Sequence, residues 1–252
     1  MRFIPGPHKI HRFMKQIWII ARRELKSFFD SLMAYIMIVA FLGFSGFFTW
    51  LYVADIFFQG QASLQVFFSI AYWTLFFFIP ALTMGLLAEE NRSGTIELLL
   101  TKPVEDWQVV LGKFLATFLL IAIAIGLTLP YYITVANIGP VDHGAVISGY
   151  VGLLLMSGSY IAIGLFASSF SNNQIVGFLA ALFIGIMFHW IFGMISMNFG
   201  GFFADLFHFL STSSHFDSMS RGVIDFTDLL YFLSIMVIGL VATESILSKK
   251  HQ

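Results

Sequence analysis

Two groups of polar side chains in this sequence could do chemistry. The first lies in residues 89–108, EENRSGTIELLLTKPVEDWQ, which hold seven charged side chains in a chain with only 13 Lys and Arg and 14 Asp and Glu. The second is a set of four potential metal ligands between residues 198 and 227, namely Asp205, His208, His215 and Asp217. Carboxylates and imidazoles are the groups from which metal sites and acid–base centres are built.

The first group is consistent with a short helix that carries an apolar face. Ser93 or Thr95 can cap such a helix, and Gly94 permits the turn beside it. Glu97 then falls in the first turn, where it complements the helix dipole, and Pro103 ends the helix. The apolar face consists of Ile96, Leu98, Leu99 and Leu100. These four side chains must be buried against lipid, against another helix of this chain, or in a partner.

The second group matches no known spacing of metal ligands. We therefore expect a solvated, loosely helical loop around Asp205, His208, His215 and Asp217, with metal binding as the alternative. The chain has no cysteine, which excludes disulfides, thiolate metal sites and Cys nucleophiles. It also lacks the G-x-x-x-x-G-K-[ST] loop that cradles nucleotide phosphates, so we expect no ATP bound by this chain.

The composition is that of an integral membrane protein. Of the 252 residues, 58% are apolar, 17% are aromatic and only 11% are charged, whereas a soluble domain carries about 25% charged residues. A spanning helix needs about 20 mainly apolar residues. The uncharged stretches predict one all-α membrane domain over residues 1–252, with six spans at residues 31–54, 66–88, 108–135, 145–168, 174–197 and 228–246.

The distribution of Lys and Arg orients these spans. If the N-terminus is cytoplasmic, the inner segments 1–30, 88–113 and 247–252 hold every Lys and Arg except Arg221. Positive charge accumulates in cytoplasmic loops. We therefore expect both termini and residues 89–108 in the cytoplasm.

Residues 10–29 predict an amphipathic helix that lies in the membrane interface ahead of the first span. At about 100° per residue, its apolar side chains share one half of the helical wheel and its basic side chains the other. Glu24 is the exception, because it falls on the apolar half, where a carboxylate is costly unless it is paired. We expect its partner in a neighbouring cytoplasmic segment, with Arg92 and Lys113 as candidates.

The interior of the spans offers little else for chemistry. Residues 31–54, 56–88, 114–141 and 143–204 contain no Asp, Glu, Lys or Arg, which disfavours a proton-coupled carrier or a cation channel. His189 stands alone in the fifth span, and we expect it to be bonded within the bundle. Pro80 and Pro130 predict kinks in the second and third spans, and small residues in the fourth span predict close helix packing.

Several segments together resemble the permease subunits of ABC-2-type transporters. The first is S-G-T-x-E-x-L-L with a following proline, directly after the second of six spans. The others are RRELKSFFDSLMAYI, LLTKPVEDWQVVLGKFLATFLL, SYIAIGLFASSFSNNQIVGF and HFDSMSRGVIDFTDLLYFLS. The resemblance covers most of residues 20–245. It is closest to the gliding-motility-associated (GldF-like) branch, with the permeases of nitrous-oxide-reductase maturation as near relatives.

The resemblance implies a dimeric transmembrane domain that works with a separate cytoplasmic ATPase, which would hold ATP and Mg. It implies that the segment after the second span is a coupling helix seated in a cleft of that ATPase, and that residues 199–226 form short re-entrant outer helices. The coupling contact would include Glu89, Glu90, Arg92, Glu97, Leu98, Leu99 and Pro103. Ser171, Asn172 and Asn173, between the fourth and fifth spans, would be a second cytoplasmic contact.

These observations predict a non-enzymatic permease subunit, without a cofactor of its own, in a bacterial cytoplasmic membrane. Its partners would be an ABC ATPase, a second permease copy or paralogue, the lipid bilayer and an extracytoplasmic auxiliary protein, but not nucleic acid. One alternative is a non-transporting membrane anchor of a motility, secretion or copper-enzyme maturation complex. Another is an ATP-independent channel or metal-handling protein built on the outer Asp and His residues.

Overall fold

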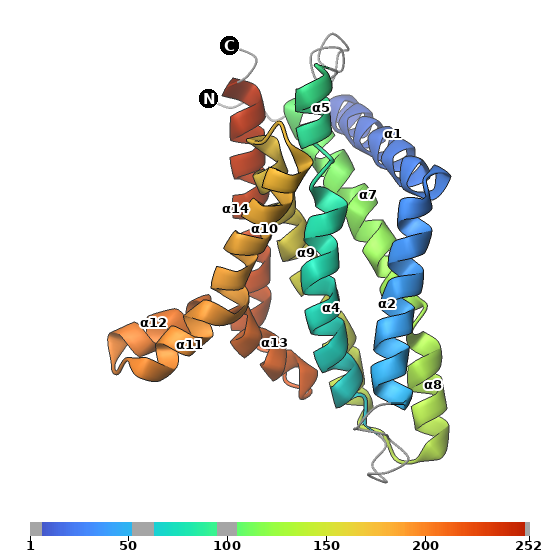
Figure 1. Cartoon of the computed structure of the whole chain (residues 1–252), viewed down its shortest axis with the longest axis vertical. Helices are drawn as coiled ribbons and strands as arrows, with labels where there is room; N and C mark the ends of the chain where they lie inside the picture. The colour runs from blue at the N-terminus through green and yellow to red at the C-terminus, as the bar shows by residue number, and fades with distance from the viewer. Residues whose placement is uncertain (1–6, 52–62, 95–104, 250–252) are drawn as a thin grey trace.

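The computed structural model describes residues 7–51, 63–94 and 105–249, and these residues form helices and no strand (Figure 1). Six helical stretches in the described residues are long and apolar enough to cross a membrane. They are Leu32–Trp50, Gln65–Ser93, Asp106–Ile138, His143–Ser169, Gln174–Asn198 and Phe226–Lys249. The prediction of an all-helical chain with six helical stretches able to cross a membrane is therefore confirmed for the described residues.

Several of these stretches consist of more than one helix. In chain order the elements are α1 (Pro7–Asp30), α2 (Leu32–Trp50), α4 (Gln65–Thr83), α5 (Ala88–Ser93), α7 (Asp106–Gly126), α8 (Leu129–Ile138), α9 (His143–Ser169), α10 (Gln174–Ile186), the π-helical turn η1 (Met187–Ile191), α11 (Phe192–Asn198), α12 (Phe202–Leu210), α13 (Thr212–Ser220) and α14 (Phe226–Lys249).

Helix α9 is the centre of the bundle and packs against α4, α7, α10, α13 and α14. The apolar part of α9 is 78% buried, against 22% for α2 and 22% for the stretch Gln174–Asn198, which consists of α10, η1 and α11. Small side chains along α9 let the other helices approach closely, and its hydroxyls bond across to them. Ser148 Oγ donates to the carbonyl of Met219 at 2.6 Å, and Ser159 Oγ donates to that of Phe232 at 3.0 Å.

The two prolines that lie inside spans have different effects. Helix α4 continues through Pro80 and ends at Thr83, and a turn then leads to α5. Pro130 is the second residue of α8, which is separate from α7. Proline is well tolerated in the first turn because the N–H that it lacks has no partner there in any helix. A third interruption, η1 in the fifth span, has no proline and was not predicted.

Helix α1 lies across one end of the bundle, against α7 (Figure 1). We call this the α5 end, because α5 and the last turn of α14 lie there as well. Ile17, Ile20 and Phe28 of α1 are buried, whereas Met14 and Trp18 on the same apolar half are more than half exposed. A helix therefore covers the predicted residues 10–29, and this chain buries only part of its apolar surface. Its position in the membrane interface stays a prediction.

At the opposite end, α11 and α12 project away from the bundle as a helical hairpin, and α13 turns back against α9 (Figure 1). Large apolar side chains on this hairpin are exposed, among them Met197, Phe199, Phe202 and Phe203. We call this the α13 end.

Gly112 is the point of closest approach between α1 and α7. A Cβ placed there would lie 2.5 Å from Ile20 Cγ2 and 2.7 Å from Ile20 Cβ, whereas a Cβ at Gly126 of the same helix would meet nothing within 4 Å.

We expect Gly112→Ala to lower stability by about 1–3 kcal/mol through overpacking. We expect Gly126→Ala to be neutral or slightly stabilising, because Ala favours helix by about 1 kcal/mol. Thermal unfolding in detergent, followed by tryptophan fluorescence, compares the two variants. Equal melting temperatures would show that α1 does not pack on α7 at Gly112.

Candidate functional site

The charged stretch, residues 89–108, begins within a short helix, α5. This helix ends at Ser93, where the sequence predicted that a new helix would begin. Glu89 and Glu90 lie in its first turn and Arg92 in its last, which suits the helix dipole. Ser93 was, with Thr95, a candidate cap for a following helix, which lies outside the described residues, so that this stays a prediction. Ser93 is the last residue of α5, and its hydroxyl donates to the carbonyl of Glu89 at 2.8 Å. Gly94 has a φ of 68° and ends the helix in the left-handed conformation.

The apolar helix predicted after Gly94 lies outside the described residues. This applies to four of the seven residues expected at the coupling contact, namely Glu97, Leu98, Leu99 and Pro103. The structure does describe the residues on both sides of that segment. On its C-terminal side α7 begins, and Glu105 and Gln108 form a capping box there. Gln108 Nε2 also donates to Gln16 Oε1 of α1 at 2.7 Å.

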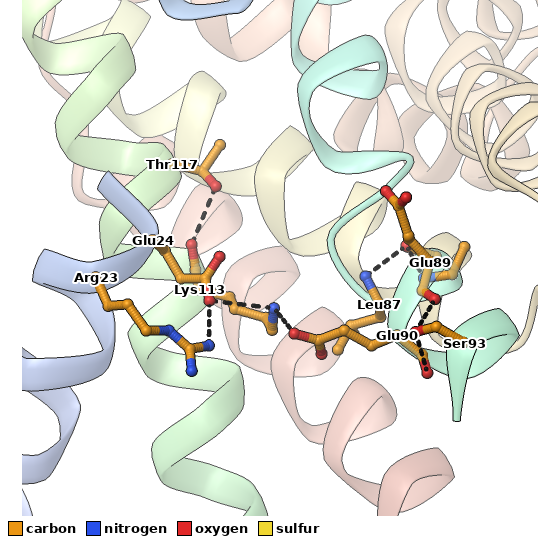
Figure 2. A network of polar contacts seen from close by, with 10 residues as sticks. Arg23, Glu24, Leu87, Glu89, Glu90, Ser93, Lys113 and Thr117 are labelled. Atoms are coloured by element: carbon orange, nitrogen blue, oxygen red, sulfur yellow. Dashed lines mark hydrogen bonds and ion pairs between the residues drawn. The ribbon is translucent and has the colours of Figure 1, made fainter. Parts of the chain in front are cut away.

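A buried lysine joins α1, α5 and α7 at this end of the bundle. The Lys113 side chain is only 2% exposed, and its Nζ lies 2.7 Å from Glu90 Oε1 and 3.6 Å from Glu24 Oε1. Arg23 in turn donates to Glu24 Oε1. We call these four residues the Lys113 network; Figure 2 shows the ammonium group of Lys113 between the two carboxylates. Positive and negative groups alternate along it, so the buried charges neutralise one another.

The network explains why Glu24 interrupts the apolar half of α1. Of the two partners expected for it, Lys113 is the residue that the structure brings within ion-pairing distance. Arg92 is exposed on α5. One atom of the network, Glu90 Oε2, is buried and has no hydrogen-bond partner in the described structure. Glu90 and Glu24 also line a cavity of about 380 Å³ between α1, α4, α5 and α10.

Hydrogen bonds attach α5 to the junction between α9 and α10. The hydroxyl of Ser168 accepts from the N–H groups of Leu87 and Ala88, at 3.1 and 3.0 Å, and donates to the carbonyl of Met84 at 2.9 Å. It therefore supplies the acceptor that the first N–H groups of a helix lack. Asn91 Nδ2 donates to the carbonyls of Ser169 and Ser171, at 3.0 and 3.1 Å.

A further bond runs from α10 to α5, since Gln174 Nε2 donates to Glu89 Oε2 at 2.7 Å. The structure thus brings together the two segments that the sequence suggested as separate contacts. Within the junction, Ser171 is buried, whereas Asn172 and Asn173 are exposed. Asn173 Oδ1 accepts from the N–H of Ile175 and so caps α10.

Polar contacts therefore attach α5 to four other helices. Six residues of α5 are held on one side by α1 and α7, and on the other by α9 and α10.

The Asp and His residues at the α13 end lie in ordered helices. Asp205 and His208 are exposed on α12, and His215 is buried in α13. The expectation of a solvated, loosely helical loop is therefore wrong for His215, whose Nδ1 lies 2.6 Å from Asp228 Oδ1 and whose Nε2 bonds the carbonyl of Phe209 at 2.8 Å. The sequence reasoning missed Asp228, which belongs to the sixth span. Over the described ranges, no three His, Asp or Glu residues are grouped closely enough to hold a metal ion.

His189 is bonded within the bundle, as expected. It is 1% exposed, its Nδ1 lies 2.7 Å from the hydroxyl of Tyr160, and its ring stacks on Tyr72 with centroids 4.0 Å apart. It lies in η1, where the extra residue of a π turn changes the direction in which the following side chains point.

Comparison with known proteins identifies the family of this chain. A family model described as ABC-2 family transporter protein matches residues 51–247, which is most of the chain. The match includes five of the six candidate spans, α5 and the α9–α10 junction. A search of curated proteins found no match.

The Lys113 network predicts a specific pattern of stabilities. Lys113→Met leaves the mostly buried carboxylate of Glu90 without its cation and leaves Glu24 paired with Arg23 alone, which we expect to cost about 3 kcal/mol. The triple variant Lys113→Met, Glu24→Gln, Glu90→Gln removes the stranded charges and should recover most of that loss. Thermal unfolding of the purified proteins measures both effects.

Lys26→Met serves as the matched control, because Lys26 is exposed on α1. It should unfold at the same temperature as the wild type. A triple variant no more stable than Lys113→Met would refute the idea that charge pairing holds the three helices together.

Proposed function

Because the chain belongs to the ABC-2 family of transporter proteins, we propose that it is the permease subunit of a transporter whose energy comes from a separate ATPase subunit. The permease moves a substrate outward or transmits force across the membrane. Two permease copies, or this chain and a paralogue, form the membrane part. The α5 end faces the cytoplasm, since the segments there carry nearly all of the Lys and Arg residues.

The observation that carries this proposal is the double attachment of α5. Ion pairing through Lys113 joins α5 to α1 and α7, and the hydroxyl of Ser168 and the amide of Asn91 join it to α9 and α10. A displacement applied just after α5 would therefore be passed to four helices at once. Such a connection is what a subunit driven from outside the membrane requires.

We assign the driving contact to residues 89–103. Arg92 is exposed and available to a partner, and Glu89 is exposed although it also accepts from Gln174. Glu90 has a different role, because its carboxylate is turned inward to Lys113. It positions α5 rather than contacting the ATPase. The apolar residues Leu98 and Leu99, with Glu97 and Pro103, would fill the cleft of the ATPase, and Asn172 and Asn173 would be a smaller second contact.

Helix α1 is proposed to lie in the membrane interface. Its exposed surface combines apolar side chains such as Trp18 and Ile19 with the basic side chains Arg22 and Lys26. Apolar groups reach into the acyl region while basic groups meet anionic headgroups. A helix held both by the interface and by Lys113 gives the bundle a fixed support against which α5 can be moved.

The test is coexpression with the ABC ATPase that this proposal requires as a partner. Leu99→Asp together with Glu97→Ala should cost about 2 kcal/mol or more of binding energy, since a charge replaces an apolar anchor. This corresponds to roughly thirtyfold weaker association. Copurification and the stimulation of ATP hydrolysis by the permease measure the effect.

Ile138→Asp is the matched control, because Ile138 is an exposed apolar residue at the end of α8. It should leave both readouts unchanged. If the double variant copurifies with the ATPase and stimulates hydrolysis like the wild type, residues 89–103 are not the coupling contact.

A further inference from the structure

The π-helical turn η1 interrupts the fifth span although its five residues, MFHWI, include no proline and no glycine. A π turn holds one residue more than the α-helical turn that it replaces. Such turns are rare, and many of them lie at functional sites. Since the local sequence does not require the turn, contacts with other helices must hold it.

His189 is the residue through which other helices hold η1. Its Nδ1 lies 2.7 Å from the hydroxyl of Tyr160 on α9, and its carbonyl accepts from the hydroxyl of Tyr72 on α4 at 3.3 Å. Its ring stacks on the rings of Tyr72 and Phe76, with centroids 4.0 and 4.3 Å apart. Side chains of α4 and α9 therefore fix both the ring and the backbone of this residue.

The second nitrogen of the same ring opposes this arrangement. His189 Nε2 is buried and has no hydrogen-bond partner in the described structure. Either tautomer leaves it unpartnered, as a donor when the proton is on Nε2 and as an acceptor when the proton is on Nδ1. A buried polar atom without a partner destabilises the conformation that contains it. A small change in the contacts of His189 can therefore alter the turn.

Beyond η1, the hairpin of α11 and α12 is held together by its own side chains. Phe207 packs against Phe192 and Phe199, with ring centroids 5.8 and 6.2 Å apart, whereas neither α11 nor α12 has a buried residue. The position of the hairpin thus depends on its two ends, η1 and Ser211. A cavity of about 820 Å³, lined by η1, α11, α12, α13 and the start of α14, gives it room to move.

We propose that η1 is a joint that converts between the π form seen here and an α-helical turn, and that His189 is the positioning residue that holds the π form through Tyr160. Because the conversion keeps every residue, it rotates α11 by about 100° relative to α10 and shifts it by about 1.5 Å. The hairpin turns with α11, and different side chains then face the cavity. The inference does not rest on ATPase coupling, and its test uses the permease alone.

The experiment measures the distance between two spin labels by double electron–electron resonance, with the full chain in lipid nanodiscs. The chain has no cysteine, so Phe203→Cys on α12 and Ile147→Cys on α9 place one label each, at positions more than half exposed. Chains with only one of these cysteines supply the background, including any distance between two copies. We expect one main distance for the pair. Tyr160→Phe should raise the population of a second distance by about tenfold or more, because it leaves His189 Nδ1 unpartnered as well.

Two further variants separate a change of the joint from a general loss of packing. Ser159→Ala is the matched control, because it also removes a hydrogen bond that α9 donates, at 3.0 Å to the carbonyl of Phe232, but on the uninterrupted helix α14. It should keep the wild-type distances. Deletion of Phe188 removes the extra residue of the turn, so that an α-helical turn forms with α10 and α11 in their present orientation. Added to Tyr160→Phe, this deletion should restore the single main distance, because the joint then has only one form.

Thermal unfolding checks that the variants are folded. Tyr72→Phe, which frees the carbonyl of His189 from its donor, should also add the second distance and provides an independent test if Tyr160→Phe does not fold. The proposal is overturned if the folded tyrosine variants keep the wild-type distances, or if Ser159→Ala adds the second distance as well. It is also overturned if the second distance persists after deletion of Phe188, since the hairpin would then detach without any change of η1.

Discussion

The buried ammonium group of Lys113 is the constraint on which the α5 end of the structure depends. Removing such a charge from water costs several kcal/mol unless opposite charges meet it at close range. Here they come from two other helices, Glu24 on α1 and Glu90 on α5. The crossing of α1 over α7 is possible because Gly112, directly before Lys113, has no side chain. Adjacent residues therefore fix both the distance between these helices and their electrostatic pairing.

Helix α5 shows how a helix too short to be stable alone can have a defined position. Isolated helices of fewer than about 12 residues are marginal in water, and α5 has six. Its stability must come from outside, and Ser168 is the clearest source, since one hydroxyl accepts two of its N–H groups and donates to a carbonyl before it. Because Ser168 belongs to the central helix α9, α5 is bonded directly to the most buried helix of the bundle.

Much of the fold could be predicted from the sequence, because a span requires a long uncharged stretch and this chain contains few charges. Glu24 was predictable as paired, since its position contradicts the helical pattern around it. The end of α5 at Ser93 could not be predicted, because serine suits either end of a helix. The left-handed conformation of Gly94 is what ends the helix there. The η1 turn has no residue that marks it. The pairing of His215 with Asp228 joins two elements 13 residues apart, and no local pattern connects them.

The alternation of charge in the Lys113 network has an electrical consequence. Arg23, Glu24, Lys113 and Glu90 carry two positive and two negative formal charges, which sum to zero. If α5 moves together with its partners on α1 and α7, these four side chains carry no net charge through the membrane potential. A lone charge would add about 2.3 kcal/mol per 100 mV to such a motion. The Lys113 network itself therefore adds no dependence on the membrane potential to a conformational change that begins at this end.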